Sequence, residues 1–331
     1  MTMSSKHRMH DRDSFRDADG HFSGFNIAQL AITSLSLSIL TCTVAVMLIY
    51  FQIDSKTLLS VDYTMCMKVN SNVTCQSIVD RQMFFDKPIE ESCTCRLEFD
   101  LHQNYQVSQI NIYYGLGNFN QNYRFLAQSR DPYFLKDQTR LKRSKSFLRP
   151  AKSKSVALPY GDLANVMFDD EFKLFYENNR DSINLDRFNI SLESLREYQY
   201  SNPSDAILLK NSSKPPRWHR HPWKLDEENP LNNGLENGPF IVWMTLSTFD
   251  DFIKLYAFVK PPGRTLKKGR YSLEIIYRFG VFGAGKGSKR IVIEMMNAHG
   301  MRNPRLLASL SCLSLLYFLL FIVVIFLVWR L

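Results

Sequence analysis

The 331-residue sequence contains few of the residues that build metal centres and catalytic pairs, with only six cysteines and seven histidines. No Ser/His/Asp or Cys/His combination can be singled out at a spacing typical of nucleophilic catalysis. His219 and His221 are separated by one residue, and no further metal ligands can be assigned to them. Consecutive acids such as Asp169-Asp170 and Asp250-Asp251 usually cap helices or face water. The sequence therefore predicts no catalytic site, metal centre or cofactor.

A glycine-rich segment has the opening spacing of a phosphate-binding loop, Gly280-x4-Gly285-Lys286. Such a loop needs Ser or Thr after its lysine to bind Mg²⁺, whereas this sequence has Gly287 there. We therefore interpret the segment as a turn. The runs on either side, residues 270–279 and 290–296, are typical of strands, which predicts an antiparallel hairpin.

Two long apolar runs indicate a membrane protein. Residues 27–51 and 306–329 each hold about 24 residues without a charged side chain, enough for a helix to cross about 30 Å of hydrocarbon. The first run is too long for the apolar core of a signal peptide. The second lacks a convincing signal for replacement by a lipid anchor, and Trp329 stands at its end as interfacial aromatics do. We predict two transmembrane helices.

Small residues in these runs suit helix packing. Ser34, Ser38, Thr41 and Ala45 form one face of the first run. In the second run Ala308 and Cys312 lie four apart with Ser311 beside them, and Cys42 and Cys312 are interpreted as packing residues. Such residues also occur on faces that contact lipid, so both alternatives stay open.

The predicted spans divide the chain into a tail (1–26), the first helix, a loop (52–305), the second helix and a short end (330–331). The loop is long enough to bury a hydrophobic core. It carries sequons for N-glycosylation at Asn72, Asn189 and Asn211, whereas proline excludes the one at Asn202. We therefore expect a lumenal or extracellular loop and two cytosolic termini.

Four cysteines lie in the loop: Cys66, Cys75, Cys93 and Cys95. A Cys93–Cys95 bridge would close a very short ring, which leaves Cys66–Cys95 with Cys75–Cys93, or the crossed alternative. Their spacing matches a zinc site poorly. Disulfides require an oxidising compartment, in agreement with the sequons.

The loop is expected to be a β-rich domain with short helices. Residues 97–114 alternate at period two, as half-buried strands do. Residues 168–176 and 247–259 have apolar spacing closer to that of helices. The basic stretch 140–154 is interpreted as a solvated loop, the alternative being docking to anionic headgroups or an acidic partner. A lumenal position excludes nucleic acid as a partner.

Dense motifs of aromatic and amide residues follow one another along the loop. Residues 111–131 read NIYYGLGNFNQNYRFLAQSRD and residues 161–170 read GDLANVMFDD. FIVWM at 240–244 with KLY at 254–256, GRYSL at 269–273 and GMRNP at 300–304 complete the series. In this order the motifs are similar to those of the cell division control protein 50 family, also called the ligand-effect modulator family. Its members are beta subunits of the type IV P-type ATPases.

The resemblance implies a β-sandwich-like lumenal domain and the nested pairing Cys66–Cys95 with Cys75–Cys93. It implies a heterodimer with the alpha subunit of a type IV P-type ATPase among membrane lipids, in which this chain is not an enzyme. Such subunits support the folding, endoplasmic reticulum exit and transport cycle of a phospholipid flippase. The chain would then be found in the endoplasmic reticulum, the Golgi or the plasma membrane.

Two other hypotheses stay open. Departures from the family pattern between residues 238 and 251 motivate an ATPase-independent surface or adhesion glycoprotein. A trimeric ligand-gated cation channel also places a disulfide-bearing loop between two spans, although such loops generally carry many more cysteines. The apolar runs here offer no acidic ring for a pore.

Overall fold

The computed structural model shows two compact units, a helix pair and a domain at Lys56–Ala298. The tail 1–26, the basic stretch 140–154 and Asn211 lie outside the described residues. The structure describes residues 27–52, 56–84, 93–107, 109–130, 135–136, 157–177, 182–203, 212–261, 265–281, 287–296 and 304–330.

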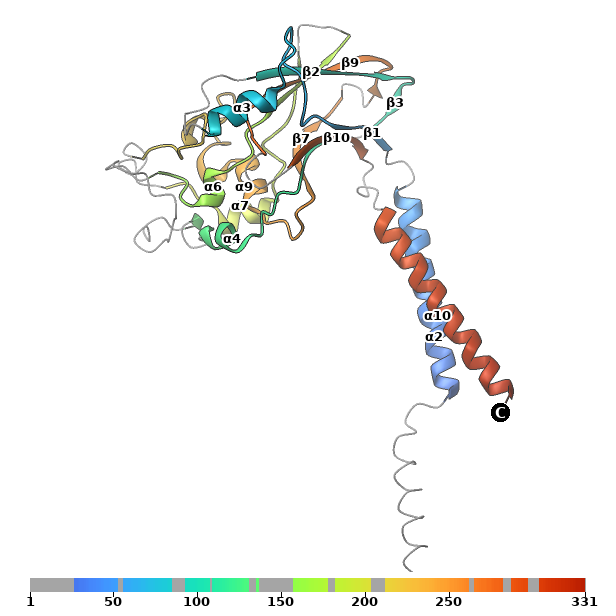
Figure 1. Cartoon of the computed structure of the whole chain (residues 1–331). Helices are drawn as coiled ribbons and strands as arrows, with labels where there is room; N and C mark the ends of the chain where they lie inside the picture. The colour runs from blue at the N-terminus through green and yellow to red at the C-terminus, as the bar shows by residue number, and fades with distance from the viewer. Residues whose placement is uncertain are drawn as a thin grey trace, which may run out of the picture. The chain divides into compact units, whose positions relative to one another are not determined.

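The helix pair consists of α2 (Ile27–Gln52) and α10 (Pro304–Arg330), which lie side by side (Figure 1). Within them, Gln29–Tyr50 and Arg305–Leu327 are long and apolar enough to cross a membrane. At the middle of the contact Ser38 and Ser314 donate their hydroxyl hydrogens to each other's backbone carbonyls, at 3.1 and 3.0 Å. These bonds satisfy both hydroxyls inside an otherwise apolar contact.

Residue size differs between the two sides of this contact. The side of α2 is made of small residues, and Ala31, Ser34, Ser38 and Ala45 are buried there. Of the small residues of α10, Ser314 lies in the contact, whereas Ala308, Ser311 and Cys312 are exposed, as is Cys42 of α2. The less exposed residues of α10 instead recur every three or four positions and are mostly large: Leu307, Leu310, Ser314, Tyr317, Phe321 and Val324.

The domain contains two four-stranded antiparallel sheets. The first has the order β1 (Lys56–Asp62), β10 (Ser288–Met296), β4 (Gln109–Gly117), β7 (Phe252–Val259). The second has the order β2 (Cys93–Leu101), β9 (Gly269–Tyr277), β5 (Glu171–Tyr176), β6 (Ser182–Ile183). A short ribbon pairs β3 (Tyr105–Gln106) with β8 (Thr265–Leu266).

The core lies between the two sheets. Apolar residues at alternate positions of β4 are buried, as the period of two predicts: Ile110, Ile112, Tyr114 and Leu116. Asn111, between two of them, is buried as well. Aromatic rings join the sheets, since Phe172 of β5 packs 4.5 Å from Tyr256 of β7 between ring centroids. The Phe172 amide also donates to the Tyr256 hydroxyl at 3.0 Å. The two chain segments are thereby fixed by packing and by a buried hydrogen bond.

The predicted hairpin at residues 270–296 is wrong. β9 belongs to the second sheet and β10 to the first, so the chain crosses between sheets after Tyr277. The helical interpretation of 168–176 and 247–259 is also wrong, because these segments contain β5 and β7. In β7 a register shift against β4 buries Tyr256 and Ala257 in succession, which interrupts the period of two.

Short helices and two disulfides complete the domain. Cys66 is bonded to Cys95, and Cys75, the first residue of α3, is bonded to Cys93, so the segment after β1 is joined twice to β2. The helices are α3 (Cys75–Phe84), α4 (Arg124–Ser129), α6 (Asp162–Asn165), α7 (Glu193–Gln199) and α9 (Gly238–Met244), with 3-10 turns at Pro222–Lys224 and Gly234–Glu236.

A fully buried ion pair lies where the sheets meet. Lys289 of β10 donates from its Nζ to Asp170 Oδ2 and to the Phe279 carbonyl, both at 2.7 Å. Both charged side chains have no exposed area. Asp170 also accepts the Tyr63 hydroxyl at 2.9 Å and the backbone amides of Arg278 and Phe279 at 2.7 Å. The Asp170 carboxylate therefore connects the two sheets with the chain segment that passes between them.

We expect Asp170→Asn to lower the free energy of unfolding by about 3 kcal/mol or more, because it leaves the Lys289 ammonium buried without a counterion. Lys289→Met should cost less, because Asp170 keeps three other hydrogen-bond donors. Urea titration of the detergent-solubilised chain, followed by tryptophan fluorescence, measures both losses. Equal, small losses would contradict this role for Asp170.

Candidate functional site

Residues from four of the motifs, those at 111–131, 161–170, 240–244 and 254–256, meet around Trp243 in a cluster formed with Gln121, Ser129, Leu163 and Lys254, here called the motif cluster. Gln121 donates from its side-chain amide to the Trp243 carbonyl at 2.7 Å. The Trp243 indole donates to the Leu163 carbonyl at 2.8 Å, and the Leu163 amide donates to the Ser129 hydroxyl at 2.9 Å. The amide and aromatic residues of the motifs thus satisfy buried backbone groups.

A glycine lets two of these segments approach closely. Gly161, directly before α6, has φ +111°, a conformation that side chains other than glycine rarely adopt. A Cβ there would lie 2.5 Å from the Ser129 carbonyl oxygen. Glycine is therefore required for Ser129 to reach the amide of Leu163.

Lys254 extends from β7 to the C-terminal end of α9. Its ammonium donates to the carbonyls of Val242 and Trp243 at 3.1 and 2.8 Å, and also to that of Thr245. These acceptors belong to the last turn of the helix, where carbonyl groups lack partners and the helix dipole favours a cation. Burial lowers the pKa of Lys254 to about 7.

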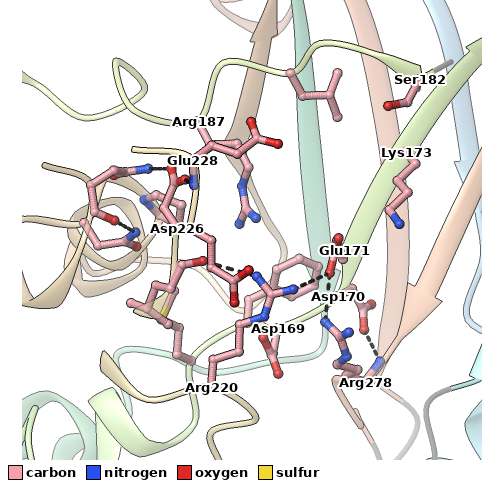
Figure 2. A pocket seen from close by; sticks show the side chains of 18 residues that line it. Asp169, Asp170, Glu171, Lys173, Ser182, Arg187, Arg220, Asp226, Glu228 and Arg278 are labelled. Atoms are coloured by element: carbon pink, nitrogen blue, oxygen red, sulfur yellow. Dashed lines mark hydrogen bonds and ion pairs between the residues drawn. The ribbon is translucent and has the colours of Figure 1, made fainter. Parts of the chain in front are cut away.

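A charged cavity of about 510 Å³ lies beside the start of β5 (Figure 2). Four cationic side chains line it: Lys173, Arg187, Arg220 and Arg278. The guanidinium groups of Arg187 and Arg220 point into it (Figure 2). Arg278 pairs with Glu171 at 3.1 Å and Arg220 approaches the same oxygen at 3.6 Å. The volume of the cavity is typical of sites that bind small molecules.

The acidic residues of this charged cavity are in different electrostatic states. Burial alone would raise the pKa of Glu171, but Arg278 and Arg220 outweigh it and lower that pKa. Burial raises the pKa of Asp169 to about 6, although Arg278 opposes the shift. Asp226 accepts the backbone amides of Glu228 and Asn229 and the side-chain amide of Asn232. Only some of the carboxylates that line the cavity are therefore available to interact with a ligand.

Those site residues predicted from the sequence that the structure describes do not line this cavity. Asn72 and Asn189 are exposed, and the Asn189 side chain donates to Asp186 at 3.0 Å. The sulfur atoms of Cys66, Cys75 and Cys95 lie within 4.8 Å of one another and belong to the two disulfides. Neither His219 nor His221 lines the charged cavity, whereas Arg220 between them does.

Sequence reasoning missed the buried charges, and the expectation for Asp169-Asp170 is wrong because Asp170 is buried in an ion pair. The sequence did contain a signal for these buried charges, namely their phase along the strands. Lys289 is in phase with Ile291 and Ile293 along β10, Lys254 with Phe252 and Tyr256, and Asp170 with Phe172 and Leu174. A charged residue in phase with the apolar face of a strand predicts a buried, paired charge.

The comparisons with known proteins identify the same family that the motifs resemble. A model of the LEM3 (ligand-effect modulator 3) family / CDC50 family matches residues 49–330. Cell cycle control protein 50A of Mus musculus is 31% identical over 257 residues, which cover 71% of this chain and 68% of that protein. Cell cycle control protein 50C of Bos taurus is 29% identical over 237 residues (69% and 67%). Putative ALA-interacting subunit 2 of Arabidopsis thaliana is 28% identical over 222 residues (66% and 59%).

The depressed pKa of Lys254 predicts a pH-dependent stability. An unfolded lysine titrates near pH 10.4, so between about pH 7 and 10 the unfolded chain binds more protons than the folded one. The free energy of unfolding should therefore rise with pH in this window, by about 1 kcal/mol per pH unit. Lys289, whose pKa burial lowers to about 8 against the opposing effect of Asp170, acts in the same direction.

Lys254→Met should reduce this slope, because the variant has no ammonium to desolvate. Urea titrations of the wild-type chain and of the variant between pH 7 and 9.5 measure how the free energy of unfolding of each protein changes with pH. Parallel curves for the two proteins would show that the Lys254 ammonium is not the cause.

Proposed function

The chain belongs to the LEM3 (ligand-effect modulator 3)/CDC50 family, and from this premise we propose that it is the non-catalytic beta subunit of a type IV P-type ATPase that moves phospholipids across a membrane. The observation that carries the proposal is the family match over residues 49–330, which includes the whole domain and α10. The partner would be the alpha subunit of that ATPase, in a heterodimer.

The chemistry of the described residues supports an accessory role. Three of their buried charged groups, Lys289, Asp170 and Lys254, are engaged with each other or with backbone groups in the protein interior. Two helices are too few to enclose a route for a phospholipid headgroup. In the proposal the lipid path and the phosphorylated aspartate therefore belong to the ATPase, while this chain supports its folding, its exit from the endoplasmic reticulum and its transport cycle.

The proposed topology places α2 and α10 across the membrane and the domain in the lumen or outside the cell. Apolar side chains on the outer faces of both helices are exposed, as expected for segments in contact with lipid or with other helices: Ile32, Ile39, Leu40 and Val46 on α2 and Leu316, Leu319, Ile322 and Phe326 on α10. Both termini would then be cytosolic, and the domain would face the oxidising side that permits disulfides.

Affinity purification of the tagged full chain from its native cells in mild detergent should recover a type IV P-type ATPase in near-stoichiometric amount, identified by mass spectrometry. Depletion of the chain should in turn keep that ATPase in the endoplasmic reticulum. Repeated absence of such an ATPase, with the chain folded and at the cell surface, would reject the subunit proposal in favour of a stand-alone glycoprotein.

The proposed topology also predicts N-glycosylation at Asn72, which is exposed. Thr74→Ala should abolish the glycan on Asn72, whereas Thr74→Ser keeps the sequon and should keep the glycan. Gel mobility before and after treatment with peptide N-glycosidase measures this. Complete insensitivity of the wild-type chain to the enzyme would contradict a lumenal domain.

A further inference from the structure

The charged cavity contains two guanidinium groups whose hydrogen-bonding capacity is incompletely used. The Nε atoms of Arg187 and Arg278 are buried and have no hydrogen-bond partner among the described residues. Arg278 as a whole is 8% exposed. Arg130 and Arg196, which do not line the cavity, also have a buried Nε without a partner, so what distinguishes Arg187 is that its guanidinium points into the cavity (Figure 2).

Arg187 is held in place by an aromatic ring and not by an acid. Its guanidinium carbon lies 4.4 Å from the centroid of the Tyr256 ring, and Tyr256 is fixed in turn by its hydrogen bond to the Phe172 amide. No carboxylate forms an ion pair with Arg187 in the part of the chain that the structure describes. Stacking thus orients this guanidinium while leaving its donors available.

Several carboxylates that could compete for Arg187 are already engaged. Asp170 is neutralised by Lys289 at 2.7 Å, and Glu171 is shared between Arg278 and Arg220. Asp226 is occupied by amide groups, while Glu227 and Glu228 are exposed. Arg187 and Lys173 therefore remain as cations of this cavity with no hydrogen bond or ion pair among the described residues.

We propose that the charged cavity binds a small ligand through an anionic oxygen group, a phosphate or phosphate ester, held by Arg187 with Lys173 and Arg278 beside it. A guanidinium donates two parallel hydrogen bonds to such a group, and the Arg187 guanidinium points into the cavity with no ion pair among the described residues. The volume of about 510 Å³ has room for a phosphate that carries a small organic substituent. The residues named here all belong to this chain, so binding to the cavity can be measured without the proposed ATPase partner.

Isothermal titration calorimetry of the detergent-solubilised full chain tests the proposal, with inorganic phosphate and glycerophosphoethanolamine as separate titrants. Ionic strength is held constant with chloride, because screening alone changes electrostatic interactions. We expect saturable binding at one site per chain. Tighter binding of glycerophosphoethanolamine would identify an esterified phosphate, as in a lipid headgroup, and tighter binding of inorganic phosphate would identify the free anion.

Arg187→Gln should weaken the binding about 10-fold or more, because it removes a charge-assisted pair of hydrogen bonds. Lys173→Gln gives a second measurement if Arg187→Gln fails to fold, and it should weaken binding less. The matched control is Arg270→Gln, which removes the same charge from a side chain that is 61% exposed and does not line the cavity. No saturable binding of either titrant, or unchanged affinity in the Arg187 and Lys173 variants, would overturn the proposal.

Discussion

The buried contact between Lys289 and Asp170 is the interaction on which the architecture of the domain depends. The chain leaves β9 in one sheet and enters β10 in the other, and at the departure point the amides of Arg278 and Phe279 need an acceptor. Asp170 supplies that acceptor from the start of β5, and Lys289 supplies the counter-charge from β10. An apolar pair would pack as well but would leave both amides unsatisfied, so a charged pair is the solution that accommodates the crossing.

The motif cluster applies the same principle at a second point of the domain. Gln121, Ser129, Trp243 and Lys254 use side-chain donors and acceptors to satisfy the backbone of short helices and irregular segments that cover the sandwich. Because these segments lack the regular ladder of a sheet, their buried amides and carbonyls require specific side chains. The motif residues of this cluster therefore have a structural role, which agrees with the proposed accessory role of the chain.

The charged cavity differs from these two interior networks. In the networks every charge has a partner in the chain, whereas Arg187 and Lys173 line the cavity without an ion pair in the described residues. The helix pair likewise satisfies its central hydroxyls through Ser38 and Ser314 and leaves apolar outer faces. Among the described residues, the charged cavity of the domain and the outer faces of the two apolar helices are thus surfaces available for recognition.

The sequence by itself determined the two long apolar helices, the β-rich class of the domain and the family, because length, hydropathy and motif order are local properties of the chain. Tertiary structure alone decided that β9 and β10 belong to different sheets, because residues 270–296 alternate equally well in a hairpin and in a crossing. It also decided the partners of Lys254, Lys289 and Asp170. Their phase along a strand indicates burial, but only the packing of distant segments determines which acceptor each charge meets.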